Sequence, residues 1–328
     1  MISIEKKNQI KIAADIIKKG GVVAFPTETV YGLGADAFNP NAVEKIFELK
    51  KRPIFDPLIV HLYSIDQLEI VCTEVDNRVY DLAEKFWPGP LTIVLKKNNK
   101  IPDIVTSGLN TVGVRIPDND IARELIKLSE TAIAAPSANK FGRISPTKAE
   151  HVQKYFSEVD FILNGGNTKV GIESTIIFLN EKGFEILRYG AITKEELEKV
   201  IPYCEIKIDQ KKLLSPGMLK SHYSPRKPFY ILNDSILNKI DKSKSGLISF
   251  TGKYDDGFKR VITLSKNQDL RECAINLFSA MHSLEDSDVE NIIAEPVPEK
   301  GIGIAIMDRL KKAAFYYMND FADNKLNT

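Results

Sequence analysis

The chain has 328 residues, of which 43% are hydrophobic and 27% charged, an ordinary composition for a soluble globular protein. Lys and Arg together number 45 against 44 Asp and Glu, so the net charge of +1 excludes a general attraction to nucleic acid or to a membrane surface. No apolar run approaches the roughly 18 residues needed to span a bilayer, and the length favours two domains.

The first 200 residues predict alternating helices and strands. Apolar residues at helical spacing over 10–17 predict an amphipathic first helix and not a signal peptide. A second helix is predicted over 40–50, a third over 76–86, and another after Ser145, which we expect to cap it. The strand candidates are too many for a simple βαβ repeat, so we predict a mixed twisted α/β sheet. They cover 22–26, 57–62, 91–96, 111–116, 131–135, 159–163, 174–179 and 184–189.

The pattern breaks over 203–228, where "LLSPGMLKSHYSPRKPF" has no sustained period and favours an extended connection. Strands resume in "FYIL", "SGLISF" and "VENIIAEPV", with helices predicted over 267–284 and 302–316. We therefore predict a first domain over 1–202, a linker over 203–228, and a smaller doubly wound α/β domain over 229–328.

The cysteines and histidines are scattered. Cys72, Cys204 and Cys273 form no CxxC pair, which suits neither zinc nor a disulfide framework and leads us to expect a reducing cytoplasm. The four histidines are equally far apart, so we predict no histidine-based metal site.

The segment "FPTETVYGLGADA", residues 25–37, follows a short buried strand. It places Glu28 between two threonines, and then sets Gly32 and Gly34 two residues apart. Glycine marks places where the backbone bends or approaches something closely. That close neighbour is either another part of the protein or a ligand.

Three cations end the helix in "ELKKRP", residues 48–53. Cations at a helix C-terminus complement the helix dipole and are usually solvated. The turn at Pro53 returns the chain beside a predicted buried strand, and two cations fixed there could instead hold a polyphosphate.

The loop "AAPSANKFGRISPT", residues 134–147, combines hydroxyl, amide and cationic side chains. Ser137, Asn139 and Ser145 lie near Lys140 and Arg143. The loop is either a polar connection with a capping serine or a phosphate-binding loop at a helix N-terminus. It contains no GxxxxGK[ST] P-loop.

Polar residues also interrupt apolar strands. Arg115 lies among valines in "NTVGVRIP", where it forms either a structural ion pair or a contact with a ligand carboxylate. His61 in "LIVHL" is either a core histidine or a functional one. Ser174 and Thr175 open the strand in "GIESTI", where β-propensity alone could explain the threonine.

Taken in order, these segments resemble the threonylcarbamoyl-AMP synthase family, the YrdC-like proteins. The resemblance rests on "FPTETVYGLGADA", Lys50-x-Arg52-Pro53, "DPLIVH", "VGVRIP", "APSAN", "ESTI" and "LRYG". The linker "SPGMLKSHYSP" and the domain after it resemble the long form of that family, with a C-terminal Rossmann-like domain.

The resemblance implies a twisted α/β sheet with an open basic cavity, and an ATP-dependent nucleotidyltransferase. L-threonine and bicarbonate would give a carbamate, which ATP with Mg²⁺ converts to threonylcarbamoyl-AMP and pyrophosphate. Downstream tRNA threonylcarbamoyltransferase proteins would then use the product to modify tRNA, and the enzyme would bind tRNA weakly at most. An anionic carbamate needs alignment and charge neutralisation more than a base.

The resemblance also implies roles for individual residues. Lys50 and Arg52 would be catalytic, Arg115 would hold the threonine carboxylate, and Thr29 with the glycine turn would form the floor of the site. Mg²⁺ would be held by the ATP phosphates and not by protein ligands. Asp56 departs from the pattern of the family, in which asparagine is expected at this position. The implied ATP site comprises Lys50, Arg52, Asp56, Thr111, Ser137, Asn139, Ser145, Arg188 and Tyr223, the threonine site Thr29, His61, Arg115 and Ser174, and a linker lid His222 and Tyr223.

Two alternatives remain at this point. A carbamoyl-transfer enzyme of hydrogenase maturation would carry extra zinc-finger-like and acylphosphatase modules, which the sequence lacks. A non-catalytic RNA-binding module would need interleaved basic and aromatic stretches, which are also missing. The sequence leaves open the role of the C-terminal domain and the oligomeric state.

Overall fold

The computed structural model describes residues 2–205 and 221–317. Within them the chain divides into two compact units. The first takes in 2–141 and 145–205, and the second takes in 142–144 and 221–317. Much of the predicted linker, residues 206–220, lies outside the described residues.

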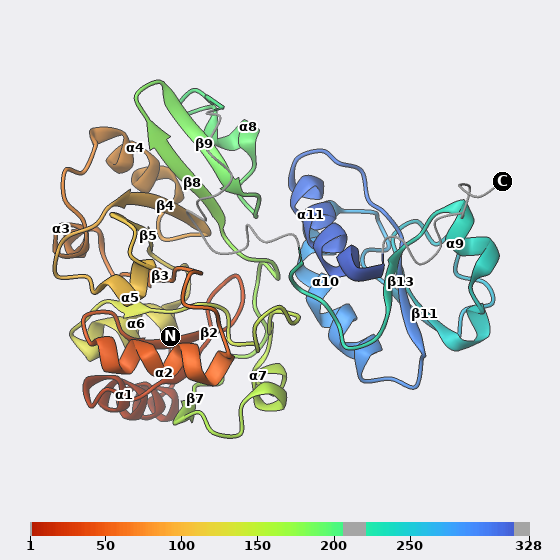
Figure 1. Cartoon of the computed structure of the whole chain (residues 1–328), viewed down its shortest axis with the longest axis horizontal. Coiled ribbons are helices and arrows are strands. Elements are labelled where there is room, and N and C mark those ends of the chain that lie inside the picture. Colours follow the sequence, from red (N-terminus) through yellow and green to blue (C-terminus); the bar gives the residue numbers. More distant parts are fainter. Residues whose placement is uncertain (1, 206–220, 318–328) are drawn as a thin grey trace. The chain divides into compact units, whose positions relative to one another are not determined.

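The first unit is built on a nine-stranded mixed sheet in the order β7-β1-β2-β6-β3-β5-β4-β8-β9 (Figure 1). The pairs β3–β5 and β4–β8 are parallel, whereas β4–β5 and β8–β9 are antiparallel. The prediction of a twisted mixed α/β sheet is confirmed. The strands are β1 Val23–Phe25, β2 Gly32–Asp36, β3 Ile59–His61, β4 Leu91–Lys96, β5 Thr111–Arg115, β6 Ile133–Ala134, β7 Phe161–Ile162, β8 Thr175–Asn180 and β9 Gly183–Arg188.

Two helices of the first unit, α2 and α4, begin where capping residues predict them. The Asn39 side chain accepts hydrogen bonds from the first turn of α2, and Asp76 caps α4 in the same way. The helices are α1 Ile4–Lys18, α2 Pro40–Lys50, α3 Leu68–Val71, α4 Asn77–Phe86, α5 Asp103–Thr106, α6 Asp120–Ser129, α7 Ala149–Tyr155 and α8 Lys194–Leu197, with the 3₁₀ turn η1 Ile65–Gln67.

Two apolar clusters lie on the two faces of this sheet. Ile10 and Ile17 of α1 pack with Leu125 of α6 and with Phe25 of β1. The larger cluster joins α2 and α4 to the other face, through residues such as Ala24 of β1. Because side chains alternate along a strand, neighbouring residues of β1 serve different clusters. Figure 1 shows α1 and α6 close together, and the two helices pack directly.

The glycines of "FPTETVYGLGADA" lie in strand β2 and not in a turn. A Cβ added at Gly34 would come within 2.6 Å of both Ile133 Cγ2 and Phe25 Cε1. The close neighbour of this backbone is therefore another part of the protein. The expectation that these glycines form a turn is wrong, because they lie in β2 and let it pack against β1 and β6.

The prediction that Ser145 caps a helix is also wrong. Helix α7 begins at Ala149, and Lys148 precedes it. The Pro146 carbonyl accepts a hydrogen bond from the Tyr31 backbone N–H at 2.8 Å, which holds this segment outside the helix. The Ser145 hydroxyl donates instead to the Glu173 carboxylate.

The second unit has a parallel four-stranded sheet in the order β10-β13-β11-β12. This confirms the smaller Rossmann-like α/β domain. None of the helices within the described ranges of either unit is long and apolar enough to cross a bilayer. The elements of the second unit are β10 Phe229–Ile231, α9 Asp234–Lys239, η2 Lys242–Lys244, β11 Ser245–Ser249, β12 Arg260–Thr263, α10 Leu270–Glu285, β13 Asn291–Ala294, α11 Ile302–Ala314 and η3 Phe315–Tyr317.

A buried carboxylate lies at the carboxyl end of this smaller sheet. Glu295 directly follows β13, and its Oε2 accepts hydrogen bonds from the backbone N–H groups of Phe250 at 2.7 Å and Thr251 at 2.8 Å. The Thr251 hydroxyl donates to the other carboxylate oxygen. The turn after β11 is therefore fixed by a side chain that lies just beyond β13.

Candidate active site

Strand alternation brings three of the predicted site residues onto one face of the larger sheet. His61 of β3 pairs with Arg115 of β5, and Thr111 lies on the same face as Arg115 because the two are four residues apart. Val60 and Val114, at the intervening positions, enter the large apolar cluster on the opposite face. These three side chains therefore lie on the sheet face turned away from that cluster.

Arg115 is buried at 3% exposure and forms an ion pair with a carboxylate from the β1–β2 loop. Its Nη2 donates to Glu28 Oε2 at 2.5 Å, and its Nη1 donates to Thr29 Oγ1 at 3.0 Å. The structure thus brings Thr29 and Arg115 together, and their role in binding threonine stays a prediction. Glu28 was not among the predicted site residues, although a carboxylate between two threonines after a buried strand was a visible signal.

Local hydrogen bonds set the position of Thr29. The Thr27 hydroxyl donates to the Val30 carbonyl at 2.6 Å and accepts from the backbone N–H groups of Thr29 and Val30 at 3.2 Å each. The Glu28 carbonyl accepts from the Val170 N–H at 2.8 Å. A short polar side chain bonded to its own turn fixes this loop without help from a helix or sheet.

His61 is buried beside Arg115, with its ring edge-on to Phe25 at a centroid distance of 6.0 Å. Burial, together with the nearby Arg115 guanidinium, lowers the pKa of His61 to about 3. The imidazole is therefore neutral at physiological pH, where one ring nitrogen can donate a hydrogen bond and the other can accept one, but the ring cannot act as a cation.

The low pKa of His61 predicts a specific acid sensitivity. The unfolded state takes up a proton near the ordinary histidine pKa of about 6.5, whereas the folded state does not until about pH 3, so stability falls as the pH drops through this window. Between pH 7 and pH 5 this term alone removes about 2 kcal/mol of unfolding free energy. Urea unfolding of wild type and His61→Asn at both pH values measures it, and equal losses in the two proteins would contradict it.

Lys50 ends α2 in a fully buried position. Its Nζ donates to the backbone carbonyl of Ser137 at 2.6 Å and to that of Asn139, so it ties the Lys-x-Arg segment to the Ser-x-Asn segment. Burial and the Arg52 guanidinium lower the pKa of Lys50 well below its usual value. Its role as a phosphate ligand stays a prediction.

Arg52 and Asp56 form a buried ion pair, with Nη2 and Oδ2 2.8 Å apart. Arg52 also donates from Nε to the Asp56 carbonyl at 2.9 Å and from Nη2 to the Pro57 carbonyl at 3.0 Å. Burial raises the pKa of the Asp56 carboxyl, although Arg52, Lys50 and Arg188 all act to lower it. The close ion pair therefore does not fully offset the cost of removing this carboxylate from water.

Arg188, predicted for ATP, contacts Ser174, predicted for threonine. Arg188 Nε donates to the Ser174 carbonyl at 3.0 Å, and its Nη2 donates to Ser174 Oγ at 3.0 Å. Ser174 Oγ also lies 2.8 Å from the Thr92 hydroxyl of β4. The two predicted subsites are thus joined by direct hydrogen bonds.

The backbone around Ser174 is packed against Gly190 of "LRYG". A Cβ at Gly190 would lie 2.3 Å from the Thr175 nitrogen and 2.6 Å from the Glu173 carbonyl oxygen, and neither backbone atom can yield. We expect Gly190→Ala to cost about 3 kcal/mol of unfolding free energy and to lower activity by displacing Ser174. Chemical denaturation measures the stability change.

Gly108→Ala is the control for that prediction. An added Cβ at Gly108 meets nothing within 4 Å, and only its φ of +77° resists the change. We expect a cost of about 1 kcal/mol there. Equal costs at the two glycines would show that Gly190 is not held by close packing.

His222 and Tyr223, predicted as a lid, are described within the second unit. Tyr223 is fully buried, with its ring centroid 5.4 Å from that of Phe278 and 5.3 Å from the Arg309 guanidinium carbon. The His222 ring lies edge-on to Tyr223 at 4.2 Å. These contacts account for the burial of the pair, and their contact with ATP stays a prediction.

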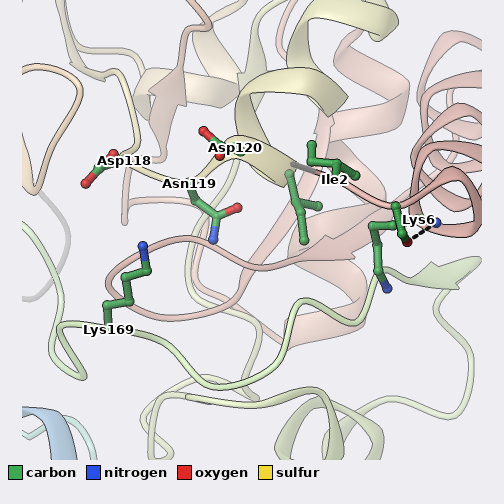
Figure 2. A pocket seen from close by; sticks show the side chains of 8 residues that line it. Ile2, Lys6, Asp118, Asn119, Asp120 and Lys169 are labelled. Atoms are coloured by element: carbon green, nitrogen blue, oxygen red, sulfur yellow. Dashed lines mark hydrogen bonds between the residues drawn. The ribbon is translucent and has the colours of Figure 1, made fainter.

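A cavity of about 520 Å³ lies in the first unit beside the starts of α1 and α6. Figure 2 shows Lys169 across from Asn119, which caps α6. The cavity contains none of the predicted site residues, but Asp118 follows Arg115 by three positions and Lys169 precedes the residue bonded to Glu28. It is lined by Ile2, Ser3, Lys6, Asp118, Asn119, Asp120, Ile121 and Lys169.

A metal cage made of protein side chains is not found within 2–205 and 221–317, where no group of three or more His, Cys, Asp or Glu residues could hold an ion. Two acids contact predicted phosphate ligands: Asp56 is paired with Arg52, and Glu173 accepts a hydrogen bond from Ser145.

Comparison with known proteins covers both units. Residues 15–190 match the family described as "Telomere recombination", and residues 192–315 match the family described as "Threonylcarbamoyl-AMP synthase, C-terminal domain". The threonylcarbamoyl-AMP synthase of Pyrococcus abyssi is 43% identical over 94% of both chains, and that of Bacillus subtilis is 41% identical over 93% of both.

Solved structures agree. The P. abyssi Sua5 structure complexed with L-threonine has a TM-score of 0.86 at 42% identity, covering 94% of this chain and 95% of that one. A variant of the same protein, with alanine in place of a histidine and of the tyrosine after it, has a TM-score of 0.87 at 41% identity over 96% and 95%. On the strength of its two matched domains and these full-length relatives, the chain belongs to the threonylcarbamoyl-AMP synthase family, in its two-domain form.

Proposed function

We propose that this chain is a nucleotidyltransferase that joins L-threonine, bicarbonate and ATP into threonylcarbamoyl-AMP, with release of pyrophosphate. This reaction would be the first step of threonylcarbamoyladenosine formation in tRNA. Downstream transferase proteins would then move the threonylcarbamoyl group to tRNA. The names of its full-length relatives support the activity, and the threonine complex of the P. abyssi protein supports the amino acid substrate.

The observation that carries the proposal is the buried cluster around Arg115. A guanidinium that already holds Thr29 and Glu28 is fixed in orientation, and its planar donors match a carboxylate. His61 is neutral beside it, so the cluster has one cation and one anion and suits a substrate with no net charge. Threonine has that charge at neutral pH.

For ATP we propose the group of basic residues formed by Lys50, Arg52 and Arg188, with Ser137 and Asn139 on the loop that Lys50 holds. Thr111, Ser145 and Asp56 complete the proposed nucleotide set. Fixed cations would neutralise charge that develops on the departing pyrophosphate. Mg²⁺ would arrive on the ATP phosphates and add charge neutralisation there.

Pyrophosphate release tests the proposal. With ATP and Mg²⁺ present, release should require threonine and bicarbonate together, and mass spectrometry should detect threonylcarbamoyl-AMP. Orthophosphate as the main product, or release without threonine, would reject it. A gel shift with tRNA alone separates this reaction from a non-catalytic RNA-binding role, for which tight binding without turnover is expected.

A contribution of His222 and Tyr223 to turnover is also part of the proposal. His222-Tyr223 is the one His-Tyr pair in this sequence, and a P. abyssi Sua5 variant replaces such a pair. We expect His222→Ala and Tyr223→Phe, which keeps the buried ring, to lower the rate or to raise the share of hydrolysed product. Unchanged turnover in both variants would leave the pair with a packing role alone.

A further inference from the structure

Two buried polar atoms of the Arg115 cluster make no hydrogen bond within the part of the chain that the structure describes. One is Glu28 Oε1, an acceptor, and the other is Arg115 Nε, a donor. Glu28 and Arg115 are only 2% and 3% exposed. A buried polar group without a partner costs about 1–3 kcal/mol, so its presence in a folded protein calls for a physical reason.

A purely structural ion pair would be expected to use both carboxylate oxygens. Arg and carboxylate groups fit each other as a two-pronged fork, with two parallel N–H···O bonds. Here a single oxygen, Glu28 Oε2, meets Arg115 Nη2, and the second oxygen stays unbonded beside it. The Glu28 backbone is held separately by the Val170 N–H, so the side chain is not needed to fix its own loop.

The unbonded donor and the unbonded acceptor complement an amino acid. A carboxylate can accept from Arg115 Nε, and an α-ammonium can donate to Glu28 Oε1. Because these two atoms belong to side chains that are bonded to each other, they present a donor and an acceptor within the span of a single small zwitterion.

We propose that Glu28 is a catalytic residue that binds the α-ammonium of threonine and takes its proton. The inference rests on the proposed function and assigns the group that makes the amine nucleophilic. An ammonium has no lone pair, so it cannot attack carbon until a base removes one proton.

The step balances with bicarbonate as the carbon source. The threonine ammonium gives one proton to the Glu28 carboxylate, which becomes a neutral acid. The amine nitrogen then forms a bond to the bicarbonate carbon, a carbon–oxygen bond of bicarbonate breaks, and that oxygen leaves as water with its own hydrogen and one from nitrogen. The products are the threonine carbamate, water and protonated Glu28, with no net change in charge.

Comparing the forward and reverse reactions distinguishes a catalytic role of Glu28 from a structural role in which Glu28 only holds Arg115 in place. The forward reaction from threonine, bicarbonate and ATP needs the ammonium proton removed. The reverse reaction, in which supplied threonylcarbamoyl-AMP and pyrophosphate form ATP, starts from a nitrogen that is already acylated. We expect Glu28→Gln, whose amide oxygen can still accept from Arg115, to slow the forward reaction at least 100-fold and the reverse reaction less than threefold.

Glu44→Gln is the matched control, because Glu44 is an exposed carboxylate on α2 and should leave both directions unchanged. Equal losses of forward and reverse rate in Glu28→Gln would overturn the inference and leave Glu28 with the structural role of holding Arg115. A forward loss below tenfold would also overturn it. If wild type forms no ATP from the supplied adenylate, the proposed reaction itself fails, and this inference with it.

If circular dichroism shows that Glu28→Gln does not fold, a second variant, Glu28→Asp, tests the same inference. Glu28→Asp keeps the charge and withdraws the carboxylate by one methylene. The forward rate should then fall at least tenfold while the reverse rate stays within threefold. A forward rate within threefold of wild type, or equal losses in both directions, would overturn the assignment.

Discussion

Replacing Arg115 with alanine is expected to cost about 3–5 kcal/mol of unfolding free energy and to remove measurable use of threonine. The variant leaves Glu28 buried at 2% exposure without its ion-pair partner, and leaves Thr29 without the donor that holds its hydroxyl. Removing one member of a buried pair is costly because the other charge stays in a medium that cannot solvate it. Denaturant unfolding and threonine titration measure the two effects.

The double variant Arg115→Met/Glu28→Gln separates stability from function. With both charges gone, most of the lost unfolding free energy should return, whereas activity should not. Arg115→Lys keeps the charge but not the planar fork, so the KM for threonine should rise with that for ATP little changed. A stability loss below 1 kcal/mol in Arg115→Ala would contradict the buried-pair account, and a changed KM for ATP alone would move Arg115 to the nucleotide.

Replacing Arg52 with alanine should be nearly as damaging, at about 3–5 kcal/mol of unfolding free energy together with at least a tenfold loss of activity. Arg52 is the ion-pair partner of the buried Asp56 and also satisfies two backbone carbonyls. Burial already raises the pKa of Asp56, so without Arg52 this carboxyl becomes harder still to ionise. The two losses are measured by urea unfolding and by pyrophosphate release.

Asp56→Asn provides the comparison within the same pair. The amide removes the buried charge and can still accept from a neighbouring donor, so Arg52→Ala/Asp56→Asn should regain much of the stability while its activity stays low. Lys51→Asn is the neighbouring control, because Lys51 is exposed, adopts the left-handed backbone that asparagine tolerates, and should stay within about 0.5 kcal/mol of wild type. Normal turnover in Arg52→Ala would remove Arg52 from the catalytic group.

Local sequence signals account for much of the fold. The Asn39-Pro40 pair predicted the first residue of α2, and the apolar run before Pro26 predicted β1. Helix α6 was not among the predicted elements, although Asn119 and the apolar spacing after it carry the same capping signal. Strand β2 was not predicted for a different reason. The segment "GLGAD" has low β-propensity and is a strand through its pairing with β1 and β6.

The site was harder to predict than the fold because its contacts are distant along the chain. Glu28 and Arg115 are 87 residues apart, so no spacing rule could reveal that they pair. Lys50 looks like a solvated helix end in the sequence, but it is buried and donates to carbonyls of a loop about 90 residues away. Residue types could therefore suggest the chemistry, whereas the partners depended on the sheet order.

The carboxylate of Glu295 limits what the second unit can bind. Parallel sheets of this kind commonly receive phosphate groups on backbone N–H groups beyond the carboxyl ends of their strands. In this chain the N–H groups of Phe250 and Thr251 already hold an anion, supplied by the protein itself. A phosphate approaching them would meet a fixed negative charge and no unsatisfied donor. At this turn, one acidic side chain of the protein itself therefore occupies two N–H groups that a phosphate would otherwise use, which argues against a phosphate site there.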